Sequence, residues 1–241
     1  MGDRFVHDLK RQKLNLNAIF GWSTYAWYVP FRRVIKALPK SRIRILELGS
    51  GPYSQLALYF DHPSNVLEIT TFPAENFNNL KAEIEGKKQK FSLRSEINTK
   101  CLSAFECTGK YDLIILKSVL GGLFRTNETN LQDVKHFVNQ LVDNNLNNDG
   151  ALVTLDNGYS AFEPLLRNFG ARKKFWRRFR KSDFSLFAEQ TSFGFFSCFS
   201  FATRIGKVGH AIDTILFGLD FILDCMGMRW RPAIIVTVYR R

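Results

Sequence analysis

The 241-residue sequence has little of what several classes of site and segment require. Its four cysteines and four histidines show no metal-ligand spacing, which argues against a zinc site and for reduced thiols. The first residues, MGDRFVHDLKRQK, are charged where a secretory leader would be apolar, so we expect a cytoplasmic protein. Internal repeats and low-complexity linkers are also missing from the chain. We therefore expect a single domain over residues 1–241, with a helical lead-in over 1–40.

Basic charge is what the chain has in excess. Apolar residues make up 45% of the sequence and charged residues 23%, as in an ordinary globular protein, but the formal net charge is +12. Such a charge favours an anionic partner or surface without identifying it.

The segment 42–54, RIRILELGSGPYS, is the most informative part of the chain. Alternating apolar and basic residues predict a buried strand that runs into a turn containing Gly49 and Gly51. Such a turn presents backbone N–H groups to a nucleotide-like ligand, because a Cβ would block both the turn and the approach. Glu47 and the lack of a third glycine at Ser54 argue against a dinucleotide site. A tight strand-to-helix turn without a ligand is the alternative.

The rest of the chain alternates between strand and helix patterns, which predicts a mostly parallel sheet with right-handed crossovers. We expect strands that start at 43, 66, 90, 111, 151, 193 and 233. We expect helices over 54–60, 75–87, 131–144, 161–169 and 208–226. A lead-in over 18–39 should form two short helices, because Pro30 breaks it.

These features together resemble the class I S-adenosylmethionine-dependent methyltransferases. YDLIILKSVLGGL at 111–123 resembles the family's fourth motif, and NNDGALVTLDNG at 147–158 resembles the loop and fifth strand that follow it. The resemblance implies an α/β three-layer sandwich with a seven-stranded, mostly parallel sheet and an antiparallel last strand. A softer similarity, through the KSVLGG stretch, is to methyltransferases of bacterial polysaccharide or secondary-metabolite gene clusters.

The resemblance also implies the cofactor, S-adenosylmethionine, and its contacts. The family places an acidic residue at the end of the second strand, where it holds the ribose hydroxyls. This chain has Thr70 there, with Thr71 next and Glu68 two residues earlier on the same side, so the ribose contact should be weaker. The expected cofactor-binding residues are Glu47, Gly49, Ser50, Gly51, Pro52, Thr70, Thr71, Lys117 and Ser118.

Residues just past the strand ends should face one crevice, because ligands of open parallel sheets bind outside those ends. Lys117 and Asp156 are the candidates for a catalytic role in moving the acceptor's proton, with Ser118 and Asn157 as orienting groups. The structural alternative is that Lys117 caps a strand end and that Asp156 and Asn157 belong to a turn.

Two further segments bear on partners. Seven Lys or Arg residues lie between Arg172 and Lys181, and Phe175, Trp176 and Phe179 would share one helical face, which suits an anionic membrane, a phosphorylated substrate or RNA. A solvated surface element with docked aromatic residues is the alternative.

The apolar helix over 208–226 carries His210, Asp213, Asp220 and Asp224 on one narrow stripe, so we expect it to be buried on more than one side. Core packing, a dimer interface, a membrane contact and a lid over the acceptor remain open.

We expect methyl transfer to a small-molecule or glycan-type acceptor, lipid-linked ones included (EC 2.1.1). A nucleic-acid methyltransferase is the first alternative, favoured by charge but lacking a DPPY-like or NPPY-like tetrad, since KSVL stands in that place. A non-catalytic cofactor-binding protein on the same fold is the second. The inner face of a membrane is the alternative location, and a homodimer remains open.

Overall fold

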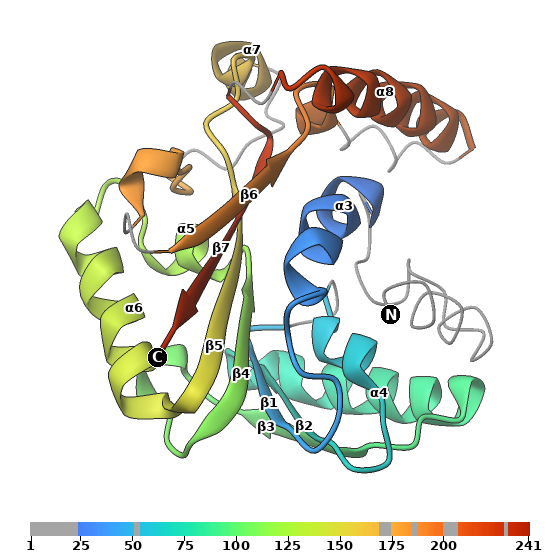
Figure 1. The fold of residues 1–241 in the computed structure, drawn as a ribbon, viewed down its shortest axis with the longest axis vertical. Coiled ribbons are helices and arrows are strands. Elements are labelled where there is room, and N and C mark those ends of the chain that lie inside the picture. Colours follow the sequence, from blue (N-terminus) through green and yellow to red (C-terminus); the bar gives the residue numbers. More distant parts are fainter. Residues whose placement is uncertain (1–23, 51–53, 169–174, 185–187, 200–206, 229–230) are drawn as a thin grey trace.

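Seven strands form one sheet in the order β3-β2-β1-β4-β5-β7-β6 (Figure 1). The computed structural model describes residues 24–50, 54–168, 175–184, 188–199, 207–228 and 231–241. The strands are β1 (Arg44–Leu48), β2 (Val66–Thr71), β3 (Glu96–Cys101), β4 (Tyr111–Lys117), β5 (Leu146–Asn157), β6 (Glu189–Phe193) and β7 (Ile234–Arg240). β1 to β5 pair in parallel, and β7 runs antiparallel between β5 and β6. This order and direction are those of the class I methyltransferase fold, which confirms the predicted fold.

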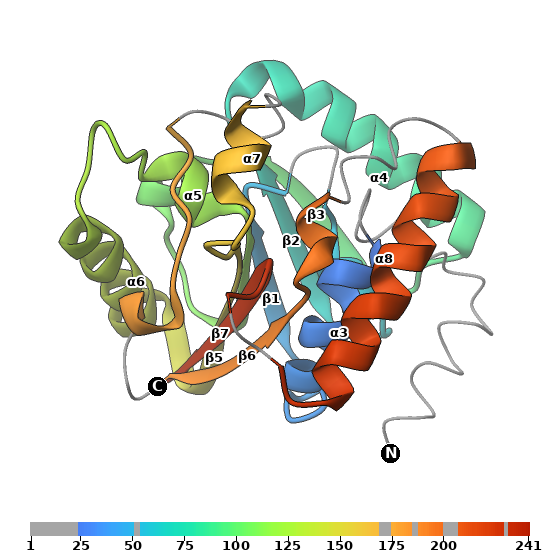
Figure 2. The same cartoon turned by 90° about the horizontal axis from the view of Figure 1, so that it is seen from above.

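Helices cover both faces of the sheet and make three layers (Figures 1 and 2). One face packs against α3 (Thr24–Ile35), the 3₁₀ helix η2 (Leu56–Phe60) and α4 (Phe77–Phe91), and we call this core cluster the α3 face. The other face packs against α5 (Val119–Leu123) and α6 (Leu131–Asn145), and we call it the α6 face. The other helical segments are η3 (Ala74–Asn76), η4 (Ala104–Glu106), α7 (Glu163–Asn168), η5 (Lys181–Asp183) and α8 (Lys207–Cys225).

The central strand β4 shows why the sequence folds this way. Its apolar run is buried on both faces, with Leu113 and Ile115 in the α3 face and Ile114 and Leu116 in the α6 face. Each such side chain contributes about 1.5–3 kcal/mol of burial free energy.

The helix α6 begins with a capping box. The Asn130 side chain accepts hydrogen bonds from the backbone N–H groups of Gln132 and Asp133, and the Asp133 carboxylate accepts one from the Asn130 N–H. These bonds satisfy N–H groups that have no partner within the helix. The predicted helix over 131–144 is thus confirmed.

Four predicted segments were placed wrongly. The fifth strand begins at Leu146 instead of 151. The third strand begins at Glu96 instead of 90, because α4 continues to Phe91, which is buried against the sheet. The sixth strand ends at Phe193 instead of starting there, and part of the range predicted for it lies outside the described residues. Residues 56–60 form a five-residue 3₁₀ helix instead of an α-helix over 54–60.

The lead-in and the apolar helix also differ from expectation. One helix, α3, runs from Thr24 to Ile35 with Pro30 inside it, so the proline does not divide the described part of the lead-in. On α8 the acidic residues Asp220 and Asp224 are buried against the protein and much of the described apolar surface faces solvent, the reverse of what we expected. Among the described residues, no helix has the length and apolarity needed to span a membrane.

Candidate functional site

The candidate site lies where the strand order reverses, at the carboxyl ends of β1 and β4. β1 pairs with β2 on one side and with β4 on the other, so the connection that leaves β1 and the one that leaves β4 lead to opposite sides (Figure 1). Ligands of doubly wound sheets bind at such a point.

The glycine turn follows β1 directly. Gly49 is exposed and has φ +65°, a left-handed conformation that favours glycine, and a Cβ there would approach Val119 to 3.0 Å. The Ser50 N–H donates to the Thr70 carbonyl at 2.8 Å. The turn therefore presents bare backbone to solvent at the switch point, which fits a ligand that needs close approach. Gly51 and Pro52, also expected to bind the cofactor, lie outside the described residues.

Thr70 is used by the turn itself. Its hydroxyl donates to the Glu47 carbonyl at 3.0 Å and accepts from the Gly49 N–H at 3.2 Å, and the side chain is fully buried. Thr71 is also buried. We expected Thr70 to make a weak ribose contact. Its hydroxyl instead links β2 to the end of β1.

Glu47 is likewise turned inward. Its carboxylate accepts from the Ser54 hydroxyl at 3.0 Å and from the Ala57 N–H at 2.7 Å, and it is 0% exposed. Burial raises the pKa of Glu47 above its usual range, against the opposing effect of these hydrogen bonds. Glu47 fixes the chain that returns from the turn to η2, and its carboxylate does not reach the surface where a cofactor's amino end would lie.

Lys117, at the end of β4, is the half-buried cation of the site. Its ammonium lies 5.1 Å from the centroid of the Trp27 ring on α3, a cation–π contact. Burial lowers the pKa of Lys117 to about 8, although attraction to Glu47 raises it. An amine with a pKa near neutrality can accept a proton from a bound acceptor.

Two polar side chains lie beside Lys117, at the ends of β4 and β5. Ser118 has φ +57° and its N–H donates to the Leu155 carbonyl at 2.7 Å, which joins the ends of β4 and β5. The Asn157 amide donates to the Ser118 hydroxyl at 3.3 Å. The structure therefore brings Ser118 and Asn157 together, beside Lys117, and both are partly exposed.

Asp156 lies on the other face of the sheet. Lys117 pairs in register with Leu155, so the next residue along β5 points the opposite way, into the α6 face. Asp156 is 1% exposed, neither carboxylate oxygen has a hydrogen-bond partner among the described residues, and burial raises its pKa to about 7. The expectation that Lys117 and Asp156 share one crevice is thus wrong, because adjacent strand positions alternate between faces.

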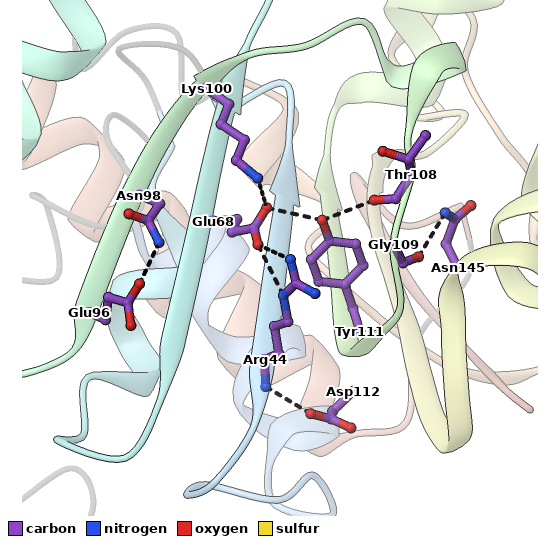
Figure 3. Close-up of polar contacts among 10 residues, drawn as sticks. All are labelled: Arg44, Glu68, Glu96, Asn98, Lys100, Thr108, Gly109, Tyr111, Asp112 and Asn145. Carbon is purple, nitrogen blue, oxygen red and sulfur yellow. Dashed lines mark hydrogen bonds and ion pairs between the residues drawn. The ribbon is translucent and has the colours of Figure 1, made fainter.

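Glu68 cannot replace the missing acidic residue, because its carboxylate is bound elsewhere (Figure 3). Arg44 donates to it through two nitrogens, Lys100 at 2.5 Å and the Tyr111 hydroxyl at 3.0 Å. The Arg44 guanidinium also lies 4.7 Å from the Tyr111 ring centroid. Burial would raise the pKa of Glu68, but these hydrogen bonds outweigh it and lower the pKa. This cluster joins β1 to β4 away from the glycine turn.

The basic aromatic segment is an extended strap instead of the expected helix. Its described part, residues 175–180, hydrogen-bonds to α5 and β5: the Arg177 N–H donates to the Gly121 carbonyl at 2.9 Å and the Phe179 N–H to the Asn157 carbonyl at 3.1 Å. We call residues 175–180 the strap. Phe179 of the strap is buried in the α6 face.

The strap explains the glycine pair in the KSVLGG stretch. A Cβ on Gly121 would come within 2.6 Å of the Arg177 carbonyl oxygen, and one on Gly122 within 2.8 Å of the Trp176 ring. The two glycines are therefore a seat for the indole. Both stretches are recognisable in the sequence, but no local pattern indicates that they pack together. The contact of Trp27 with Lys117 was not predicted either, although the aromatic lead-in was a signal for it.

Comparison with known proteins adds the fold alone. No family model and no curated protein sequence matches this chain. Among solved structures, a possible exported protein from Bordetella parapertussis is 12% identical, with 88% of this chain and 65% of that chain covered and a TM-score of 0.54. Magnesium protoporphyrin IX methyltransferase from Synechocystis, with bound SAH, is 15% identical (73% and 69% covered, TM-score 0.45). TehB from Haemophilus influenzae is 16% identical (TM-score 0.39), with 54% of this chain and 40% of TehB covered, so the chain spans less than half of that protein.

Proposed function

We propose that this protein is an S-adenosylmethionine-dependent methyltransferase that acts on a small-molecule or glycan-type acceptor. The observation that carries the proposal is the exposed left-handed turn at Gly49, at the switch point of a class I methyltransferase sheet. S-adenosylmethionine supplies an activated methyl group and leaves as S-adenosylhomocysteine. Positioning the two reactants is the main contribution required of the protein and can be worth about 7–11 kcal/mol.

In this proposal Lys117 handles the acceptor's proton. Its amine has a pKa of about 8 and stands beside Ser118 and Asn157, which can orient a hydroxyl or amine by hydrogen bonds. The Trp27 ring shields one side of the amine from water. Asp156 lies on the other face of the sheet and is buried, so we assign it no proton transfer.

Calorimetry with S-adenosylhomocysteine tests the cofactor site, with NAD as the competing ligand. Gly49→Ala should abolish binding, because a Cβ at this turn is strained and approaches Val119. Gly86→Ala on α4 is the matched control, since a Cβ there meets nothing within 4 Å, and it should bind as the wild type does. Binding of NAD without S-adenosylhomocysteine, or unimpaired binding by a folded Gly49→Ala protein, would contradict the proposal.

Competitive acylation of lysines tests the role of Lys117 without knowledge of the acceptor. Burial lowers the pKa of Lys40 to about 8 as well, and Lys40 bonds to the Ile35 carbonyl away from the site. Both lysines should show labelling midpoints near pH 8, and S-adenosylhomocysteine should slow the labelling of Lys117 alone. Equal protection of both, or of neither, would remove Lys117 from the site.

A non-catalytic cofactor-binding protein is the second candidate, and the end of β2 favours it. Thr70, Glu47 and Glu68 all spend their polar atoms on the protein itself, so no described carboxylate at β2 is free for a ribose. Incubation with S-adenosylmethionine labelled in its methyl group and a cell extract separates the two. Label in a small molecule or glycan supports the enzyme, and binding of S-adenosylmethionine without any transfer supports the second candidate.

A further inference from the structure

The helix α8 carries an apolar surface that faces solvent. Its outward side chains recur at intervals of three and four residues and include Ile215 at 64% and Met226 at 68% exposure. The other large exposed apolar residues on or just after the helix are Ile212, Leu219, Phe221, Ile222 and Met228. Contiguous apolar surface of this kind marks a contact with another apolar phase.

The polar side of the same helix is fixed to the protein. The buried Asp220 carboxylate accepts from the N–H groups of Phe195, Phe196 and Ser197, each at 2.7 Å. The buried Asp224 forms an ion pair with Arg33 of α3. Because these bonds set the rotation of α8 about its axis, the apolar side cannot turn inward without losing them.

The apolar side is too broad for a single partner helix. At about 100° per residue, the exposed positions from Ala211 to Met226 cover about half the circumference. Among them Thr214 is the one polar side chain described. A coiled-coil seam is a narrow stripe, and α8 offers about two heptads of it. A flat apolar phase, in contrast, takes up half of a helix that lies along its surface.

The basic charge of the chain indicates which kind of lipid surface α8 would bind. The net charge is +12, and in the sequence Lys207 begins the helix while Arg229, Trp230 and Arg231 follow it. Basic residues and an aromatic residue at the ends of an apolar helix are typical of helices that lie in the headgroup region of anionic membranes.

We propose that α8 docks this protein on the surface of an anionic phospholipid membrane, with its apolar side in the headgroup and acyl-chain boundary. Figure 1 shows α8 beyond the end of the sheet toward which the parallel strands point, and Arg33 connects it to the helix that carries Trp27. A docked protein would thus hold its candidate site close to the membrane. The docking itself does not depend on the proposed methyl transfer.

Vesicle co-sedimentation of the full chain tests the docking. We expect binding to phosphatidylcholine vesicles that contain phosphatidylglycerol and much weaker binding to phosphatidylcholine alone. Ile215→Ser with Ile222→Ser should weaken binding by more than about tenfold, because two exposed apolar side chains are lost from the contact. Both side chains lie at the surface, so the variant should keep the wild-type circular dichroism and thermal transition.

A charge-matched pair separates apolar docking from simple electrostatics. Ile215→Glu with Ile222→Glu should abolish binding, whereas Asn79→Glu with Gln89→Glu makes the same change in charge at exposed positions of α4 and should leave most of it. Equal loss in the two pairs would overturn the proposal, since binding would then follow net charge alone.

Two exposed cysteines give a readout specific to position. An environment-sensitive fluorophore on Cys225, which lies on the exposed side of α8, should shift to the blue with anionic vesicles, and one on Cys101 of β3 should not. Absence of vesicle binding by the wild type would overturn the proposal. So would a dimer that Ile215→Ser with Ile222→Ser makes monomeric while vesicles have no effect, since the occupant would then be a second copy.

Discussion

Thr70 shows how a single hydroxyl can serve the fold where a cofactor contact was expected. It has one proton to donate and uses it on the Glu47 carbonyl, while its oxygen accepts from the N–H of Gly49. Both bonds hold the turn at the end of β1. The position is therefore fixed by the backbone geometry around the turn, and a carboxylate cannot reproduce it, because an ionised carboxylate accepts hydrogen bonds and donates none.

Thr70→Asp should consequently destabilise the protein and weaken binding of S-adenosylhomocysteine. The carboxylate would face the Glu47 carbonyl in a fully buried place, at a cost of about 1–3 kcal/mol or more in the free energy of unfolding. Urea denaturation and calorimetry measure the two effects, and Thr99→Asp on the edge strand β3, where the side chain is partly exposed, is the control. Stronger binding at unchanged stability would restore the ribose contact that the family resemblance implies.

At the scale of elements, the strap and α5 form one unit. Trp176 lies on the glycine pair, and the Arg177 guanidinium donates to the carbonyls of Phe124 at 2.8 Å and Thr129 at 2.6 Å. The buried Arg178 lies near Glu163. Part of the basic cluster therefore packs the segment onto the fold. Only the remaining basic residues of 172–181 are left to bind the anionic partner that the sequence predicts.

A double-mutant cycle on Gly122 and Trp176 measures the interaction between the glycine position and the indole. Gly122→Ala should cost about 1–3 kcal/mol in the free energy of unfolding, because its Cβ would lie within 2.8 Å of the indole. In a Trp176→Ala background the same change should be nearly neutral, since the side chain it would meet is gone. Additive effects in the cycle would show that the indole does not lie on Gly122.

Arginines of the strap should differ in their effect on stability. Arg177→Gln should lower the melting temperature, because two carbonyls lose a charged donor, worth about 1.5–3 kcal/mol each. Arg180 is exposed and its guanidinium lies over the Tyr159 ring at 5.3 Å, so Arg180→Gln should change the melting temperature little. Equal small effects of the two substitutions would show that the Arg177 side chain does not stabilise the fold.

The elements that the sequence predicted well are those whose signal is local. The apolar run of β4 and the amphipathic pattern of α6 contain their own evidence, so both were placed within one residue. The site was harder, because its geometry depends on register. No local pattern indicates that Lys117 pairs with Leu155 and so faces away from Asp156, or that Trp176 packs on Gly122, 54 positions earlier in the chain.

The apolar helix was misjudged for a related reason. Its sequence shows one polar stripe and an apolar remainder, and the usual inference is that the apolar part is buried. The partners of the acidic residues, Arg33 and the N–H groups at 195–197, lie far away in the sequence and reverse the orientation of α8. Tertiary hydrogen bonds decided which side of the helix faces the protein.

At the scale of the whole molecule, buried titratable groups should shape the dependence of stability on pH. The pKa of Glu68 is lowered, so its contribution is present above its unfolded pKa and is lost as the pH falls through the lower folded value. The pKa of Asp156 is raised to about 7, so the folded state binds its proton more tightly, and stability falls as the pH rises from its ordinary 3.8 to about 7. The pKa values of Lys117 and Lys40 are both lowered from 10.5 to about 8, so stability rises again between those two values.

Between pH 4 and pH 9, the free energy of unfolding should therefore be highest near the acidic end, decline up to about pH 7, and recover above pH 8. Asp156→Asn should remove the part of the decline that Asp156 causes, because an amide carries no charge to bury, and the raised pKa of Glu47 should leave a smaller decline in the variant. At pH 8 the variant should be more stable than the wild type by an amount on the order of a few kcal/mol, and at pH 4 the two should be nearly equal. Urea denaturation across pH 4–9 measures this, with Asp143→Asn on the exposed side of α6 as the control. A wild-type stability that rises between pH 5 and 7 and a destabilised Asp156→Asn protein would together show that Asp156 is ionised and paired in the folded state.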